Sequence, residues 1–162
     1  MKVYFKKVNF KPFAELNTYS SLNPIPFTLK FQRSHFLPET VYARNLEGEN
    51  FIEFRFNKET KQLYEITLVA IQEDTVVSGI DSPFNDDELF ECYIDDDSEL
   101  EISNPVQILR SDSSLHFSWC KCPPKTYAIT KICGLGVDND NNLCSLSLVG
   151  LDEELIRDIL GF

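Results

Sequence analysis

The chain of 162 residues has the length of one domain, and its apolar content of 43% is enough to fill a hydrophobic core. Its net charge of −11 at pH 7 argues against nucleic acid and anionic membranes as partners, because both are themselves polyanions. We therefore expect one globular domain over residues 1–162, with no nucleic-acid and no membrane partner.

Alternating apolar and polar residues predict β-strands along most of the chain. In chain order, the predicted strands are 2–6, 27–31, 51–56, 63–71, 106–109, 115–119, 126–130, 132–137 and 143–149. A polar turn at 57–62 joins two of these strands into a hairpin. A second turn at 138–142, rich in Asp and Asn that tolerate positive φ, joins the last two.

Helical periodicity is clear only near the end of the chain. Residues 151–160 place their apolar side chains on one helical face, acidic residues occupy the first turn, and Gly161 suits a C-cap. A weaker helix is predicted at 85–91, with Asn85 as N-cap, and a short turn at 13–19. The predicted fold is mainly β (α+β): an antiparallel, sheet-based single domain built from hairpins, with a short C-terminal helix. Trp119 is expected to be core.

Two hairpins resemble each other in sequence. Residues 54–57 and 63–71 can be laid over 135–138 and 143–151, and the second strands match without a gap at an offset of eighty residues. The turn is one residue shorter in the second copy. A duplicated unit explains the match, and so does convergence of two amphipathic hairpins on one pattern. The sequence leaves both explanations open.

The negative charge is concentrated in the middle of the chain. Residues 62–109 contain thirteen acidic residues and no Lys or Arg, and ten of the acidic residues lie between Asp81 and Glu101. The stretch is either a solvated acidic face or an electrostatic docking surface for a cationic partner. In the second interpretation, aromatic residues anchor the partner and carboxylates surround them. The predicted partner-binding residues are Phe84, Asp86, Asp87, Glu88, Phe90, Glu91, Tyr93, Asp95, Asp96, Asp97, Glu99 and Glu101.

The cysteines and the start of the chain indicate a cytoplasmic protein. The first residues lack the continuous apolar stretch, of roughly 7–15 residues, that a signal peptide requires. No stretch approaches the ~18 apolar residues of a membrane helix. Five cysteines in a chain without a secretory signal are typical of reduced thiols. Cys92, Cys133 and Cys144 are expected in the core.

No metal site or cofactor site is predicted. Cys120 and Cys122 are a Cys-X-Cys pair, but no second pair at zinc spacing accompanies them. The turn at 138–142 resembles the start of a calcium loop, yet Leu143 and Val149 stand where such a loop needs Gly and Glu. No Gly-rich phosphate loop occurs either.

The two histidines do not indicate a catalytic site. His35 and His116 each lack a nucleophile at a spacing that the sequence can place beside them. The sequence therefore predicts a protein that is not an enzyme, although a hydrolase whose residues no motif reveals is a third class of explanation.

Residues 134–160 resemble the strand, turn, strand and short helix of bacterial immunity proteins in polymorphic toxin systems, including those of contact-dependent growth inhibition. Residues 51–71 have a similar pattern, so the resemblance covers about a third of the chain. It implies a cytoplasmic protein that neutralises one cognate toxin by tight binding, often a basic nuclease. The alternative is a non-catalytic interaction or regulatory module unrelated to toxins.

Overall fold

The computed structural model describes residues 1–18, 27–33, 36–45, 50–79, 84–95, 101–102 and 104–161. Within these ranges the chain forms two six-stranded sheets. The first contains β2 (Glu15–Thr18), β3 (Phe27–Lys30), β4 (Thr40–Asn45), β5 (Phe51–Asn57), β6 (Leu63–Ala70) and β9 (Glu101–Ile102), in the order β2-β3-β6-β5-β4-β9. The second contains β7 (Val76–Ser78), β10 (Gln107–Arg110), β11 (Ser114–Ser118), β12 (Lys125–Ala128), β13 (Cys133–Val137) and β14 (Leu143–Val149), in the order β12-β13-β14-β11-β10-β7.

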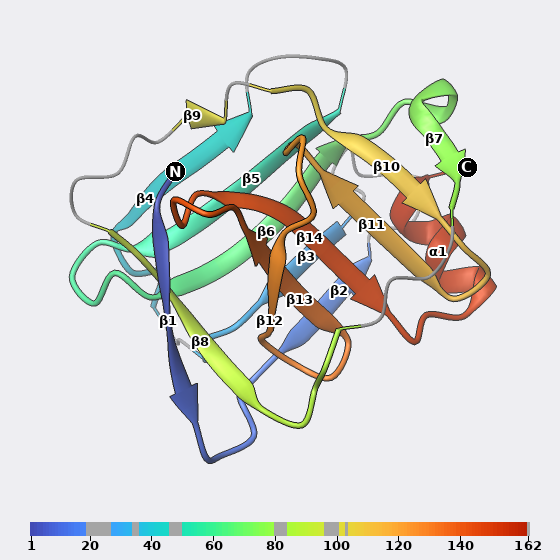
Figure 1. Cartoon of the computed structure of the whole chain (residues 1–162). Helices are drawn as coiled ribbons and strands as arrows, with labels where there is room; N and C mark the ends of the chain where they lie inside the picture. Colours follow the sequence, from blue (N-terminus) through green and yellow to red (C-terminus); the bar gives the residue numbers. More distant parts are fainter. Residues whose placement is uncertain are drawn as a thin grey trace.

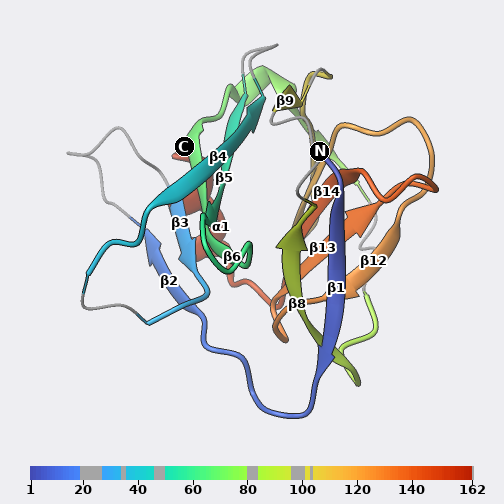
Figure 2. The same cartoon turned by 90° about the vertical axis from the view of Figure 1, so that its left-hand side faces the viewer.

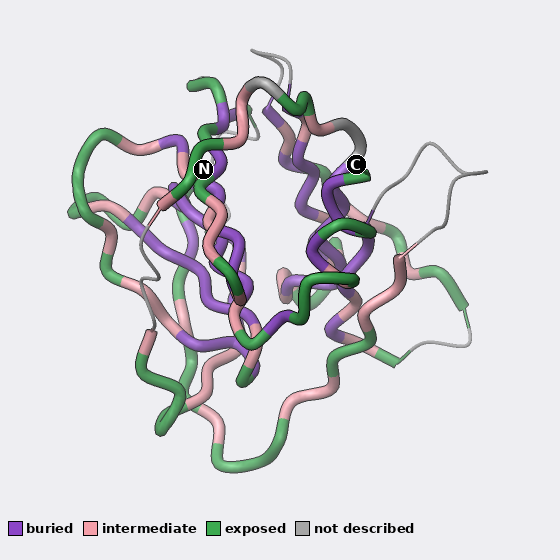
Figure 3. The backbone as a smooth tube through the Cα atoms, turned by 90° about the vertical axis from the view of Figure 1, so that its right-hand side faces the viewer, coloured by how far each residue is buried: buried purple, intermediate pink, exposed green. Residues whose placement is uncertain are grey.

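The two sheets face each other, and their inner faces form the core (Figures 1 and 2). Alternate residues of the central strands point inward, as the period of a half-buried strand requires. The largest fully buried side chains include Phe27, Phe54 and Phe56 from the first sheet, and Leu115 and Phe117 from the second. Figure 3 shows the buried segments of the two sheets turned toward each other.

A two-stranded ribbon closes one side of this sandwich. It consists of β1 (Val3–Val8) and β8 (Leu89–Ile94), paired antiparallel. The amide of Val3 donates to the carbonyl of Asn141 in the β13–β14 turn, at 3.0 Å. The amide of Ile94 donates to the carbonyl of Lys61 in the β5–β6 turn, at 2.9 Å. The ribbon is therefore bonded to both sheets.

Helix α1 (Glu153–Leu160) lies on the opposite side of the sandwich from the ribbon (Figures 1 and 2). The Asp152 side chain accepts from the amide of Leu155 at the N-terminus, and Gly161 ends the helix in the left-handed conformation. Ile156, Ile159 and Leu160 are buried. No helix in the described ranges is long and apolar enough to cross a membrane.

The two sheets repeat one arrangement. In each, an antiparallel strand pair is followed by a three-stranded meander whose last strand returns beside the pair, giving β2-β3-β6-β5-β4 and β10-β11-β14-β13-β12. The registers of the corresponding strand pairs also agree. Leu29 lies opposite Ile66 in the β3–β6 pair, and Phe117 lies opposite Leu146 in the β11–β14 pair. The repeat of the arrangement thus covers five strands per sheet, whereas the sequence match at an offset of eighty covers β6 and β14. A shared order of five strands favours duplication over convergence.

The two hairpin turns repeat in detail as well. Lys61 and Asn141, eighty positions apart, have φ angles of 64° and 61°. Asn57 and Asp138 begin the turns, and the side-chain oxygen of each accepts amide hydrogen bonds from later turn residues. The 3-10 helix η1 (Glu73–Thr75) follows β6 at the position that corresponds to the start of α1 after β14. The first hairpin is therefore followed by a single helical turn and the second by a longer helix.

The structure confirms the mainly β fold, the predicted hairpins and the C-terminal helix, and it corrects several local predictions. The helix at 85–91 is wrong, because Leu89–Ile94 pairs with β1, and the turn at 13–19 is wrong, because Glu15–Thr18 is a strand. Two short edge strands pair parallel, β9 with β4 and β7 with β10. Trp119 is buried, as predicted.

Candidate functional site

The predicted acidic docking stretch runs along the whole length of β8. Asp86 and Asp87 precede the strand and Asp95 follows it, and all three are exposed. Six residues of strand separate the two ends by about 20 Å. Asp96, Asp97 and Glu99 lie outside the described residues. The stretch is therefore an extended border of the ribbon and not one compact patch.

The carboxylates on β8 lie beside lysines on β1. Lys7 and Glu88 form an exposed ion pair at 2.6 Å, and Lys6 lies opposite Glu91 in the strand register. At the far end, the amide of Asp95 donates to the carbonyl of Lys2 at 3.0 Å. The basic N-terminal strand thus partly balances the acidic strand within the fold itself.

Two of the three predicted aromatic anchors pack inside the protein. Phe90 contacts the Tyr127 ring edge-on, with centroids 5.1 Å apart. Phe84 lies so close to Gly134 that a Cβ at residue 134 would be 2.7 Å from its ring. Both rings are half-buried, and these contacts use them for packing within the protein.

The third predicted anchor, Tyr93, is part of a surface cluster that sequence reasoning did not assemble. Its ring stacks on Tyr4 of β1, with centroids 5.3 Å apart and planes inclined by 12°. The ammonium group of Lys6 lies 4.4 Å from the Tyr93 centroid, a cation–π distance. Tyr4, Lys6, Glu91 and Tyr93 are called the ribbon face below.

The ribbon face combines aromatic surface with a fixed carboxylate. The Tyr93 hydroxyl donates to Oε2 of Glu91 at 2.6 Å, and burial together with this bond raises the pKa of Tyr93 to about 12. Tyr4 stays 42% exposed. The sequence did not single out Tyr4, because Tyr4 joins the site only through its stacking on Tyr93 of β8. The pairing of β1 with β8 was not predicted, since residues 85–91 were assigned to a helix.

Glu101 lies away from the ribbon face. It is on β9, opposite Arg44 of β4 in a parallel register, and is exposed. The structure therefore does not place it with Glu88 and Glu91.

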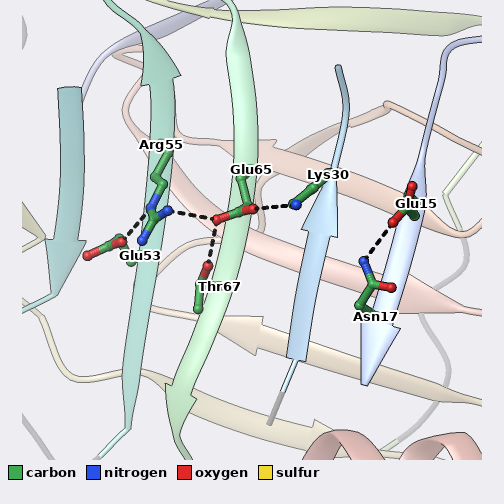
Figure 4. Close-up of polar contacts among 7 residues, drawn as sticks. All are labelled: Glu15, Asn17, Lys30, Glu53, Arg55, Glu65 and Thr67. Atoms are coloured by element: carbon green, nitrogen blue, oxygen red, sulfur yellow. Dashed lines mark hydrogen bonds and ion pairs between the residues drawn. The ribbon is translucent and has the colours of Figure 1, made fainter. Parts of the chain in front are cut away.

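A second polar cluster covers the outer face of the first sheet (Figure 4). Arg55 on β5 donates through Nε to Glu53 at 2.9 Å and lies 3.1 Å from Glu65 through Nη1. Lys30 and Arg44 extend the cluster to β3 and β4, at 3.9 Å from Glu65 and 3.3 Å from Glu53. Lys30, Arg44, Glu53, Arg55 and Glu65 are called the charge ladder below. The sequence did not predict it, although the alternation in 51–56 placed Glu53 and Arg55 on one face of the strand.

The charge ladder is suited to holding the sheet together. Its two carboxylates are buried, and Arg55 bridges them. Each carboxylate also contacts a second cation, Arg44 at Glu53 and Lys30 at Glu65, so both are engaged in ion pairs within the sheet. We therefore assign the charge ladder to stability.

The cysteines form two groups. Cys92 and Cys133 are fully buried beside each other, and burial raises the pKa of both thiols. Cys120, Cys122 and Cys144 line one open pocket of about 430 Å³. Within the part of the chain that the structure describes, no group of three or more His, Cys, Asp or Glu side chains is arranged to hold a metal ion.

His116 lies on β11 and contacts Ser147, with Nδ1 2.8 Å from the serine Oγ. Burial lowers the pKa of this histidine. His35 and its neighbour Ser34 lie outside the described residues. Neither Ser147 nor His116 lines the 430 Å³ pocket. We therefore interpret the bond between the imidazole and the serine as packing within the sheet.

No protein-family model matches the chain, and no curated protein matches its sequence.

Proposed function

We propose that the protein is an immunity protein that binds one cognate toxin and blocks it without catalysing a reaction. The observation that carries this proposal is the ribbon face, where the exposed Tyr4 stacks on the half-buried Tyr93 beside the carboxylate of Glu91. The class of partner comes from the resemblance of residues 134–160 and 51–71 to immunity proteins. The toxin is expected to be a basic protein such as a nuclease.

The tyrosine pair has the properties of an interface anchor. Tyrosines bury a large area on binding and lose little conformational entropy, and they are enriched among residues that dominate binding energy. Stacking holds Tyr4 and Tyr93 in place before the partner arrives, which reduces the ordering cost further. The pair also lies on a ribbon that is bonded to both sheets, so the anchor is rigid.

The surrounding charge selects a cationic partner. The whole chain carries −11, and Asp86, Asp87 and Asp95 are exposed at the two ends of β8. Such a field accelerates encounter with a positively charged protein and repels nucleic acid. Carboxylates can also pair with the Lys and Arg residues that a nuclease uses to hold phosphates. The inhibitor would then occupy the place of the substrate.

The lysines of β1 do not oppose this mode of binding. The Lys7–Glu88 pair is exposed on both sides, and such pairs contribute only about 0–1 kcal/mol. A guanidinium group of the toxin can therefore replace Lys7 at Glu88 at small cost. The proposal places the protein in the cytoplasm, where it would protect the cell that makes it.

The test compares the native protein with the variant Tyr4→Ser/Tyr93→Ser. Each is co-expressed with the product of the gene next to its own, and cell growth and complex formation are measured. We expect the native protein to bind a basic toxin and restore growth, and the double variant to fail at both while remaining folded. Tyr42→Ser is the matched control, because Tyr42 is 40% exposed, close to the 42% of Tyr4, but lies on the first sheet.

Two results would contradict the proposal. If the double variant protects cells as well as the native protein, the ribbon face is not the docking surface. If the native protein binds a partner that has no toxic activity, the protein is an interaction module of the alternative kind.

A further inference from the structure

An open pocket of about 430 Å³ forms where the start of the chain, the loop after β11 and the β13–β14 turn meet. Three of the five cysteines line it, namely Cys120, Cys122 and Cys144. They differ in access, since Cys122 is exposed, Cys120 is half-buried and Cys144 is buried. The proposed function makes no use of this pocket.

Backbone contacts hold the loop carrying Cys120 against the strand carrying Cys144. The amide of Trp119 donates to the carbonyl of Cys144 at 2.9 Å, and the Trp119 indole donates to the carbonyl of Leu143 at 2.7 Å. Cys120 follows directly, and its thiol lies 3.2 Å from the carbonyl of Cys122. Cys120 and Cys144 thus start from neighbouring strands at the same wall of the pocket.

The thiols also interact with one another. Burial, followed by the neighbouring Cys120 thiol and then by the charge of Asp138, raises the pKa of Cys144. Cys144 is therefore the less reactive member when the protein is reduced, since the thiolate is the nucleophile. Cys120 opens onto the pocket and can meet a small oxidant first.

We infer that Cys120 and Cys144 are a reversible oxidation site at which hydrogen peroxide oxidises the two thiols to a disulfide bond. The Cys120 thiolate attacks one peroxide oxygen and forms a sulfenic acid, while the O–O bond breaks and hydroxide leaves, taking the thiol proton as water. The Cys144 sulfur then attacks the Cys120 sulfur and the S–O bond breaks. The leaving hydroxide takes the Cys144 proton as a second water. Two thiols are oxidised and one molecule of hydrogen peroxide is reduced, and a dithiol reverses the step.

The other cysteines serve as internal controls. Cys92 and Cys133 also lie beside each other, but both are fully buried, and burial raises the pKa of both thiols. They should not react in the folded protein. Cys122 is exposed, so it should react with an alkylating reagent before and after oxidation of the pair.

The single tryptophan of the chain gives a direct readout. Trp119 is adjacent to Cys120 and bonded to Cys144, and disulfide bonds quench nearby indoles. We expect hydrogen peroxide to lower Trp119 fluorescence in the native protein, and dithiothreitol to restore it. Peptide mapping should recover a 120–144 disulfide and a free Cys122.

Serine variants assign the effect to the pair. Cys120→Ser and Cys144→Ser should each abolish the fluorescence change, whereas Cys122→Ser and Cys92→Ser should keep it. If burial makes Cys144→Ser unstable, Cys120→Ser, on a half-exposed loop residue, carries the test alone. A mapped 120–122 disulfide, or oxidation of Cys120 to a sulfinic acid with Cys144 still free, would overturn the inference. Persistence of the toxin-neutralising activity in these variants would leave the proposed function intact.

Discussion

Phe84 illustrates how a residue that looks like a binding anchor can be used for packing. Its ring covers Gly134 on β13, where any side chain would collide with it. The glycine is thus required by close approach and not by backbone conformation. We therefore assign the anchor role to the tyrosine pair, of which Tyr4 is exposed, and not to Phe84.

The Phe84–Gly134 contact predicts a strong coupling. Gly134→Ala should lower the free energy of unfolding by about 1–3 kcal/mol, because the new methyl group overpacks against the ring. In a Phe84→Ala background the same change should cost much less, since the ring is gone. Urea unfolding of the four proteins measures this. Equal effects of Gly134→Ala in both backgrounds would show that Phe84 does not pack on residue 134.

His116 predicts a pH dependence of stability. Burial lowers the pKa of His116 in the folded protein below its ordinary value of 6.5. The unfolded chain therefore takes up the proton first as the pH falls, so the free energy of unfolding decreases from about pH 7 downward, by at most ~1.4 kcal/mol per pH unit. The loss stops once the folded state is protonated too.

The control for this prediction is His116→Asn, which can keep the bond to Ser147 but does not titrate. Between about pH 7.5 and 5.5, urea unfolding should show a smaller loss of stability for the variant than for the native protein. Parallel losses in the two proteins would mean that His116 is not the group responsible.

At the scale of elements, the charge ladder fixes the register of the first sheet. Glu53 and Glu65 share Arg55 across β5 and β6, and a register shift by one residue would separate them. Buried carboxylates that lose their cation are costly, unlike exposed pairs.

Arg55→Met should therefore lower the free energy of unfolding by about 3 kcal/mol, because it leaves two buried carboxylates without their shared cation. Arg157→Met is the matched control, since Arg157 pairs with Glu153 on the exposed surface of α1, and it should cost less than about 0.5 kcal/mol. Adding Glu65→Gln to Arg55→Met should recover part of the loss. If the two arginine variants are equally mild, the charge ladder does not stabilise the sheet.

The two hairpin turns offer a test of equivalence. Lys61 and Asn141 have positive φ, which β-branched residues avoid. Lys61→Val and Asn141→Val should each lower the free energy of unfolding by about 1–2 kcal/mol, and Glu59→Val, an exposed change in the same turn as Lys61, by less than about 0.5 kcal/mol. Thermal or urea unfolding measures all three. A large loss at only one of the two turn positions would argue against their equivalence.

The pattern of apolar and polar residues predicted those elements whose conformation is determined by residues close together in the sequence. The β5–β6 and β13–β14 hairpins have alternating strands and polar turns, and α1 has its cap and apolar face within ten residues. Strand β8 could not be predicted in the same way. Asn85 and the acids after it fit a helix start, and the pairing that overrides this preference comes from β1, eighty residues earlier. The ribbon face depends on that pairing, so the sequence supplied Tyr93 but not Tyr4.

At the scale of the whole molecule, the two sheets share one arrangement and differ in charge. The outer face of the first sheet carries the charge ladder, while the equivalent positions of the second carry Ser145, Ser147, Gly134 and Gly136. The two sheets share one order of five strands, and the ribbon of β1 and β8 belongs to neither six-stranded sheet. That ribbon carries the tyrosine pair, with Asp86 and Asp87 before β8 and Asp95 after it.

The most direct test of the docking role is the kinetics of complex formation with the toxin at several salt concentrations. Neutralising Asp86, Asp87 and Asp95 to Asn should slow association and flatten its salt dependence, with little change in dissociation. Tyr4→Ala/Tyr93→Ala should instead speed dissociation, by about tenfold or more, with little change in association. Association and dissociation rates that match the native protein in both variants would contradict a docking surface on the ribbon.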